Sequence, residues 1–210
     1  MLYLYQSYVI PRIEYASILW NPYQVRNIIR LEAVQRTMTS KIDGLQKLNY
    51  HQRLRKLKMY SMQRRRERFI AIYMFKIASG LVPNNVQLDF YESSRKGTMC
   101  HLPKLRSATT HLCTVRKNYF TSTGPAIYNI IPREIKNAKT LDQFKNQLDR
   151  FLKEIPDLPP TPGYPSINKN SILEWALGNY DYADIIETLT ERRRRDEQSE
   201  RGATDQPDGS

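Results

Sequence analysis

Cysteine is nearly absent from this sequence, which contains only Cys100 and Cys113. Two cysteines cannot supply the several crosslinks of a disulfide-rich secreted scaffold. The longest apolar runs, Phe69–Ala78 and Ile127–Pro132, are far shorter than the roughly 20 residues that a membrane span needs. The sequence does not open with a charged segment, an apolar run and a cleavage site, so no signal peptide is indicated. We therefore expect reduced cysteines, no membrane partner, and an intracellular protein of the cytoplasm or nucleus.

Acidic residues are scarce in the first three quarters of the chain. Residues 1–155 hold 27 Lys and Arg against 10 Asp and Glu, a net charge of +17. Residues 156–210 hold 6 against 11, a net charge of −5. A body this basic favours an anionic partner, most commonly nucleic acid. The alternative is a basic protein that its charge merely keeps soluble.

Apolar residues recur mostly at helical spacing, so the predicted fold class is mainly α. We expect a bundle of helices, an irregular segment with at most one β-hairpin, and a C-terminal tail helix. The predicted divisions are 1–80 (helical bundle), 81–117 (irregular segment), 118–155 (helical connecting region), 156–170 (Pro-rich linker), 171–195 (tail helix) and 196–210 (disordered).

Local signals place the first helices. Pro11 interrupts an apolar stripe over residues 2–20, which predicts a kink or two short helices. Asn21 followed by Pro22 indicates the start of the next helix. Its expected core-facing stripe is Ile28, Leu31, Val34, Met38 and Ile42, and Gly44 is expected to end it. A short helix is expected from about Tyr50 to Leu57.

Ser61 is predicted to cap a long helix whose later half is apolar. Arg65 and Arg66 fall where the apolar stripe should continue, so its first turns are expected to project beyond the core. Thr140 with Gln143 forms a capping box before the clearest amphipathic stripe of the chain. Its members are Leu141, Phe144, Leu148, Phe151, Leu152 and Ile155.

Other segments carry turn formers. Residues 84–117 lack helical period, and a hairpin is expected around Thr98–Leu102 and Thr110–Val115. Gly124 with Pro125 indicates a kink in a short helix. Residues 156–165 read as an extended linker. Ser171 and Glu174 suggest a capped final helix to about Arg195.

The stretch from Lys41 to Arg68 is the strongest candidate for a binding site. Positive charge interleaved with Tyr50, His51 and Tyr60 suits phosphate contact and base stacking. The alternative is a solvated helical face, although acidic partners for local pairing are scarce. The candidate nucleic-acid-binding residues are Lys41, Lys47, Arg53, Arg55, Lys56, Lys58, Arg64, Arg65, Arg66 and Arg68.

Metal and catalytic chemistry are poorly supported. Cys100, His101, His111 and Cys113 could converge in a hairpin, but adjacent ligands suit tetrahedral zinc poorly, and ordinary loop residues are the favoured interpretation. Tyr182-Ala183-Asp184 looks like part of a polymerase motif but continues with Ile185. Helical ion pairing accounts for these carboxylates better than two-metal catalysis does. No metal, cofactor or catalytic residue is expected.

Several segments, in order, carry a resemblance to a known family. They are Tyr8–Pro22 (YVIPRIEYASILWNP), Leu31–Arg36, Gly44-Leu45, Arg53–Leu57, Arg116–Phe120, Tyr128–Pro132 and Phe144–Leu148. Together they resemble the region that follows the palm in reverse transcriptases of LINE-type, non-LTR retrotransposons, especially Jockey-like elements. The chain departs from the family pattern at three positions. Tyr128 and Ile131 stand where the family usually has Trp and Leu, and Thr123 stands where it commonly has Arg.

The resemblance implies a thumb-like region that grips an RNA template and primer duplex. The catalytic aspartates of the family lie in a preceding palm, so no polymerisation is expected from this chain alone. An inert truncated copy, or a subunit supporting a polymerase chain, are the alternatives. Tyr3, Tyr5, Tyr8 and Trp20 would partly face the missing palm, which predicts exposed apolar surface and self-association.

Overall fold

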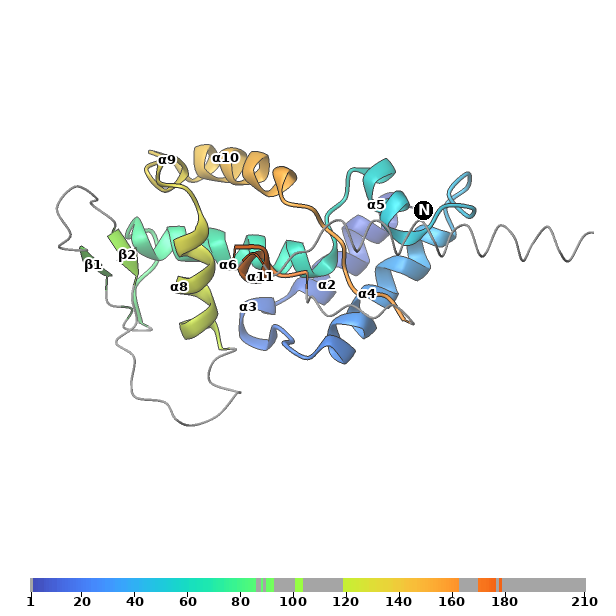
Figure 1. The fold of residues 1–210 in the computed structure, drawn as a ribbon, viewed down its shortest axis with the longest axis horizontal. Coiled ribbons are helices and arrows are strands. Elements are labelled where there is room, and N and C mark those ends of the chain that lie inside the picture. Colours follow the sequence, from blue (N-terminus) through green and yellow to red (C-terminus); the bar gives the residue numbers. More distant parts are fainter. Residues whose placement is uncertain are drawn as a thin grey trace, which may run out of the picture.

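The computed structural model describes residues 2–85, 88, 90–92, 101–103, 119–162, 170–176 and 178 (Figure 1). These residues are mainly helical, which confirms the predicted fold class. The helices are α1 (Leu2–Leu4), the π-helical η1 (Tyr5–Val9), α2 (Ile10–Glu14), α3 (Ser17–Trp20), α4 (Val25–Ser40), α5 (Tyr50–Leu57), α6 (Met62–Ala78), α8 (Phe120–Ile130), α9 (Arg133–Lys136), α10 (Leu141–Glu154) and α11 (Ile172–Ala176). The strands are β1 (Phe90–Glu92) and β2 (His101–Pro103).

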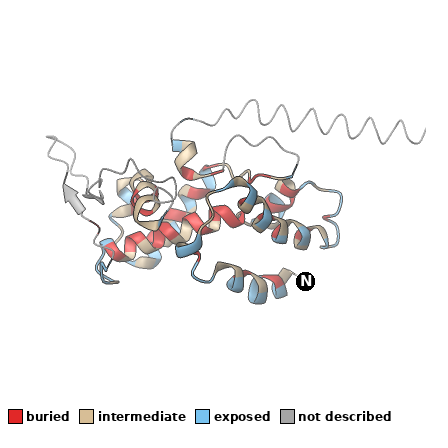
Figure 2. Ribbon diagram, turned by 90° about the horizontal axis from the view of Figure 1, so that it is seen from below, coloured by how far each residue is buried: buried red, intermediate tan, exposed pale blue. Residues whose placement is uncertain are grey.

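Helix α6 is the central element, and it runs along the long axis of the body (Figure 1). It contacts α3, α4, α8 and α10. The predicted cap is confirmed, since the Ser61 hydroxyl accepts a hydrogen bond from the Arg64 backbone N–H at 3.1 Å. Gly80 follows the helix with a φ of +68°, a conformation that glycine adopts without strain. Figure 2 shows buried residues along nearly the whole of this helix.

The hydrophobic core lies between the later half of α6 and helices α8 and α10. The Phe75 and Phe144 rings stack at 4.1 Å between centroids. Gly124 lets α8 approach α6 closely, because a Cβ there would lie 2.9 Å from the Met74 sulfur. Pro125 lies inside an unbroken α8, so the kink expected at Gly124-Pro125 does not end the helix.

Helix α10 follows its sequence pattern closely. The Thr140 hydroxyl accepts from the Gln143 backbone N–H at 3.2 Å, as the capping signal predicts. The Gln143 side chain accepts from the Lys139 N–H instead of the Thr140 N–H that a full capping box would use. Phe144, Leu148 and Leu152 are its buried residues. A clean apolar stripe therefore predicted both the helix and its buried face.

The N-terminal segment breaks later than expected. Pro11 lies in the first turn of α2, where a missing N–H costs little, and a π-helical turn precedes it. The break follows at Ala16, whose φ of +51° is left-handed. The expected division into short helices is therefore confirmed, but the break lies five residues downstream of Pro11.

Helix α4 corrects two expectations. It begins at Val25 after Gln24, not at Asn21 and Pro22. Its buried residues are Ile28, Glu32, Gln35 and Thr39, whereas Val34 of the predicted stripe is exposed. The face that packs against α6 is therefore largely polar, which a search for apolar spacing cannot detect.

The remaining elements are short. Strand β1 pairs antiparallel with β2, with Tyr91 opposite Leu102. The expected second strand at Thr110–Val115 lies outside the described residues, as does the tail beyond Gly178. The prediction of an extended Pro-rich linker is partly wrong, because Pro159 and Pro160 are buried. Helix α11 is described only from Ile172 to Ala176.

Candidate nucleic-acid interface

The ten predicted binding residues divide into an interior group and an exposed group. Five are buried or engaged in polar contacts within the protein: Arg53, Arg64, Arg65, Arg66 and Arg68. Five are exposed: Lys41, Lys47, Arg55, Lys56 and Lys58. We call the exposed five the cationic surface. The division corrects the sequence interpretation, which treated the whole stretch as one face.

The start of α6 does not project beyond the core. The side chains of Arg64 and Arg66 are 0% and 1% exposed. Arg64 donates to the Pro156 carbonyl at 2.9 Å, and its Nε lies 4.0 Å from a carboxylate oxygen of Asp157. Arg66 donates to Asn21 Oδ1 at 2.8 Å. Neither guanidinium can reach a phosphate without unpacking the protein.

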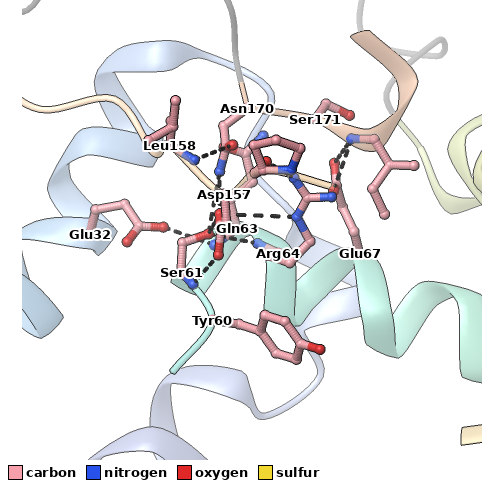
Figure 3. Close-up of polar contacts among 12 residues, drawn as sticks. Glu32, Tyr60, Ser61, Gln63, Arg64, Glu67, Asp157, Leu158, Asn170 and Ser171 are labelled. Carbon is pink, nitrogen blue, oxygen red and sulfur yellow. Dashed lines mark hydrogen bonds and ion pairs between the residues drawn. The ribbon is translucent and has the colours of Figure 1, made fainter. Parts of the chain in front are cut away.

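Asp157 lies in the segment that was predicted to be a linker, and it connects this segment to the start of α6 (Figure 3). Its carboxylate accepts from the Ser61 N–H and from the Ser61 hydroxyl, both at 2.6 Å, and from Asn170 Nδ2 at 2.7 Å. Glu67 is buried and accepts from the Ile172 N–H at 3.1 Å. Burial raises the pKa of Glu67, and nearby Arg64 opposes that rise. These contacts order the chain that follows α10.

The other interior arginines form contacts nearer the surface. Arg65 pairs with Glu14 of α2, and Arg68 pairs with Asp149 of α10, donating from its second guanidinium nitrogen at 2.8 Å. Arg53 donates to the Leu48 carbonyl at 2.9 Å. Local acidic partners are scarce, as predicted, but this scarcity does not leave Arg65 and Arg68 unpaired, because Glu14 and Asp149 come from distant parts of the chain.

Glu32 is a buried carboxylate that sequence reasoning missed. It accepts from the Tyr50 hydroxyl at 2.7 Å and from the Gln63 backbone N–H at 2.8 Å. Burial raises its pKa to about 7, against the opposing effect of these two hydrogen bonds. The Tyr5 hydroxyl donates to Gln35 in the same interior layer at 3.2 Å. The sequence signal for this face was a set of polar residues at helical spacing on α4. The prediction considered only the apolar residues of that helix.

The cationic surface lies on α5, on the connection between α4 and α5, and on Lys58, which directly follows α5. Asp43 is the only acidic residue between positions 41 and 58. Within the described part of the chain, none of the five cationic side chains forms an ion pair. A capping box between Asn49 and Gln52 fixes the start of α5. The surface therefore presents uncompensated positive charge on a defined helix.

The interleaved aromatic residues are less available than expected. Tyr50 is buried, so it cannot stack on a base. His51 and Tyr60 are half-buried. The Tyr60 hydroxyl donates to the Asp149 carbonyl at 3.1 Å, which fixes the ring beside α10.

The N-terminal helices expose large apolar side chains. Tyr3 and Tyr15 are 80% and 81% exposed, and Leu4, Tyr8 and Leu19 are also largely exposed. The expectation that Tyr5 belongs to this exposed apolar surface is wrong, because Tyr5 is buried. Trp20 is more covered than the others, and its indole N–H donates to the Tyr15 carbonyl at 2.7 Å.

The predicted metal and catalytic residues lie largely outside the part of the chain that the structure describes. The described residues contain no group of three or more His, Cys, Asp or Glu placed to hold a metal ion. Cys100, His111, Cys113 and the segment around Asp184 lie outside the described residues. None of the helices that the structure describes combines the length and apolar character of a bilayer span.

Comparison of this chain with protein-family models, with curated proteins and with solved structures finds no match.

Proposed function

We propose that this chain corresponds to the thumb-like region that follows the palm in LINE-type reverse transcriptases, and that it binds RNA or an RNA–DNA duplex without sequence preference. The observation that carries the binding role is the cationic surface, whose five exposed cations lie in a segment with one acidic residue, Asp43. Long-range attraction to phosphates suits such a surface and requires no base reading. An intracellular site of action, in the cytoplasm or nucleus, and the absence of catalysis by this chain alone belong to the same proposal.

Removing the cationic surface should abolish most of the binding. We expect alanine at Lys41, Lys47, Arg55, Lys56 and Lys58 together to weaken affinity for an RNA–DNA hybrid. Each lost phosphate contact should flatten the log–log salt dependence by about 0.7 to 0.9. Fluorescence anisotropy of a labelled hybrid at several salt concentrations measures both quantities.

A matched control removes the same charge elsewhere. Alanine at five other exposed cations should change the salt slope much less; they are Arg12, Arg26, Arg30, Lys139 and Arg150. Equal losses in the two variants would show that net charge alone governs binding. An absence of saturable binding by the wild-type monomer at low salt would reject the binding role and favour an inert truncated copy.

The exposed apolar side chains of the N-terminal helices favour a second role as a subunit. Large apolar residues at this exposure are typical of a surface that another protein covers. We expect nucleotide incorporation on a primed RNA template only when a separately expressed palm domain is added. Tyr8→Glu with Leu19→Glu should abolish this stimulation without lowering the free energy of unfolding, because both side chains are solvated.

Two results would contradict the subunit role. The palm domain could work equally well alone, or the double variant could stimulate as well as wild type does. If the same variant instead dissociates oligomers of this chain in sedimentation, the apolar residues join two copies.

A further inference from the structure

A groove adjoins the cationic surface and shares Arg55 and Lys58 with it. It lies between α5, the connection from α5 to α6 and the end of α10, with a volume of about 700 Å³. That size falls within the roughly 300–1,000 Å³ of ordinary ligand pockets. The lining residues that the argument uses are His51, Leu54, Arg55, Lys58, Met59 and Tyr60.

The groove is electropositive despite the acidic residues in its wall. Asp149 is paired with Arg68, and the Asp157 carboxylate accepts three hydrogen bonds from Ser61 and Asn170. Both carboxylates are thus compensated from within the protein. Exposed Arg55, Lys58 and Lys153 also line the groove, against one exposed acid, Glu154. An anionic ligand is therefore favoured over a cationic one.

The interior of the groove is apolar, with a polar group at its side. Leu54, Leu152 and Ile155 are buried and line the groove, together with half-buried Met59 and Tyr60. The His51 Nδ1 atom is buried and has no hydrogen-bond partner among the described residues. Burial lowers the pKa of His51, so the ring is neutral at pH 7 and carries one donor and one acceptor nitrogen.

These features together specify the chemistry of the occupant. An apolar floor suits a flat ring, and the cations suit flanking phosphates. A base within a duplex is stacked and paired, so it would have to leave the helix to enter a groove. A single strand presents its bases without that cost.

We propose that this groove holds one nucleotide of a single-stranded nucleic acid, with its base over the apolar floor and its phosphates at Arg55 and Lys58. The inference rests on the proposed binding function and deepens it. The duplex would be held by charge alone on the cationic surface. An unpaired template or primer segment would be held by charge and by the groove.

Anisotropy with a single-stranded 12-mer and a blunt hybrid of the same length tests the inference. Met59→Trp, which fills the groove, and His51→Ala should each weaken single-strand binding by about tenfold, since one stacked base contributes roughly that factor. Neither variant should change binding of the blunt hybrid. Lys47→Ala, outside the groove lining, should weaken both.

A second measurement uses wild-type protein, so it does not depend on whether a variant folds. A 12-mer carrying 5-iodouracil should crosslink on irradiation within residues 51–60. Crosslinks confined to other segments, or groove variants that bind both nucleic acids as wild type does, would overturn the groove proposal while leaving the cationic surface intact. If neither nucleic acid binds, the proposed function fails first, and capture of an acidic peptide by the groove would replace both.

Discussion

Replacing Arg64 by methionine should lower the free energy of unfolding by about 3–5 kcal/mol, because removing one member of a buried charge network leaves the other members uncompensated. The Arg64 side chain is fully buried, close to Asp157 and to the Pro156 carbonyl. Buried Glu67 also depends on its positive charge. Methionine fills a similar volume, so the loss reports charge and hydrogen bonding more than cavity formation.

Urea denaturation followed by circular dichroism measures this loss. Lys56→Met is the matched control, since it removes the same charge from an exposed position of α5 and should stay within about 0.5 kcal/mol of wild type. If the Arg64 variant were equally mild and instead weakened nucleic-acid binding, the interior placement of this arginine would be wrong. The experiment thus separates an arginine that holds the fold from one that holds a phosphate.

Glu32→Gln should remove a large part of the pH dependence of stability. Burial raises the pKa of Glu32 from 4.5 to about 7. Between these values the folded protein retains a proton that the unfolded chain has released, so the contribution of this group to stability falls as pH rises. That displacement corresponds to about 3 kcal/mol. Above pH 7 Glu32 is charged in the folded protein too, and its burial then lowers the free energy of unfolding by this full amount.

The measurement is the difference in unfolding free energy between variant and wild type. This difference should rise in favour of Glu32→Gln by about 3 kcal/mol from pH 4.5 to pH 7.5. Glutamine keeps an acceptor for the Gln63 N–H and offers its amide N–H to the Tyr50 hydroxyl oxygen. Glu154→Gln, at an exposed position, should show a flat difference. A flat difference for Glu32 too would mean that the carboxylate stays ionised throughout.

Taking the difference between the two proteins removes the other buried groups from the result. The pKa of Glu67 is also raised by burial, so this group contributes a pH dependence of the same sign. The pKa of His51 is lowered by burial, so it contributes the opposite sign. Both residues are present in both proteins, and their contributions cancel to first order.

Local sequence signals were sufficient to predict those helices that carry one strong pattern. The caps at Ser61 and Thr140 are hydrogen-bonded to the third residue of their helices, as predicted. The apolar stripe of α10 faces the core. Each of these features depends on residues within one or two turns of each other, so a single sequence contains what is needed to predict them.

The position of the charged residues was decided only by tertiary structure. The sequence showed ten cations with two nearby acids, and all ten were predicted to bind nucleic acid. Four of them are instead held by groups distant in the chain, such as Asp149, which lies 81 positions from Arg68. Burial of an arginine requires partners that desolvate with it, and only the folded chain brings those partners together.

The same reason explains the missed polar face of α4 and the missed groove. Glu32 is buried because Tyr50 and a backbone N–H of α6 satisfy it, 18 and 31 positions away. The groove forms where α5 meets the end of α10, which no local pattern connects. The sequence by itself determined the helical class, the strong caps and the excess of positive charge. The tertiary structure alone decided which of those charges face solvent, because that depends on contacts between residues far apart in the chain.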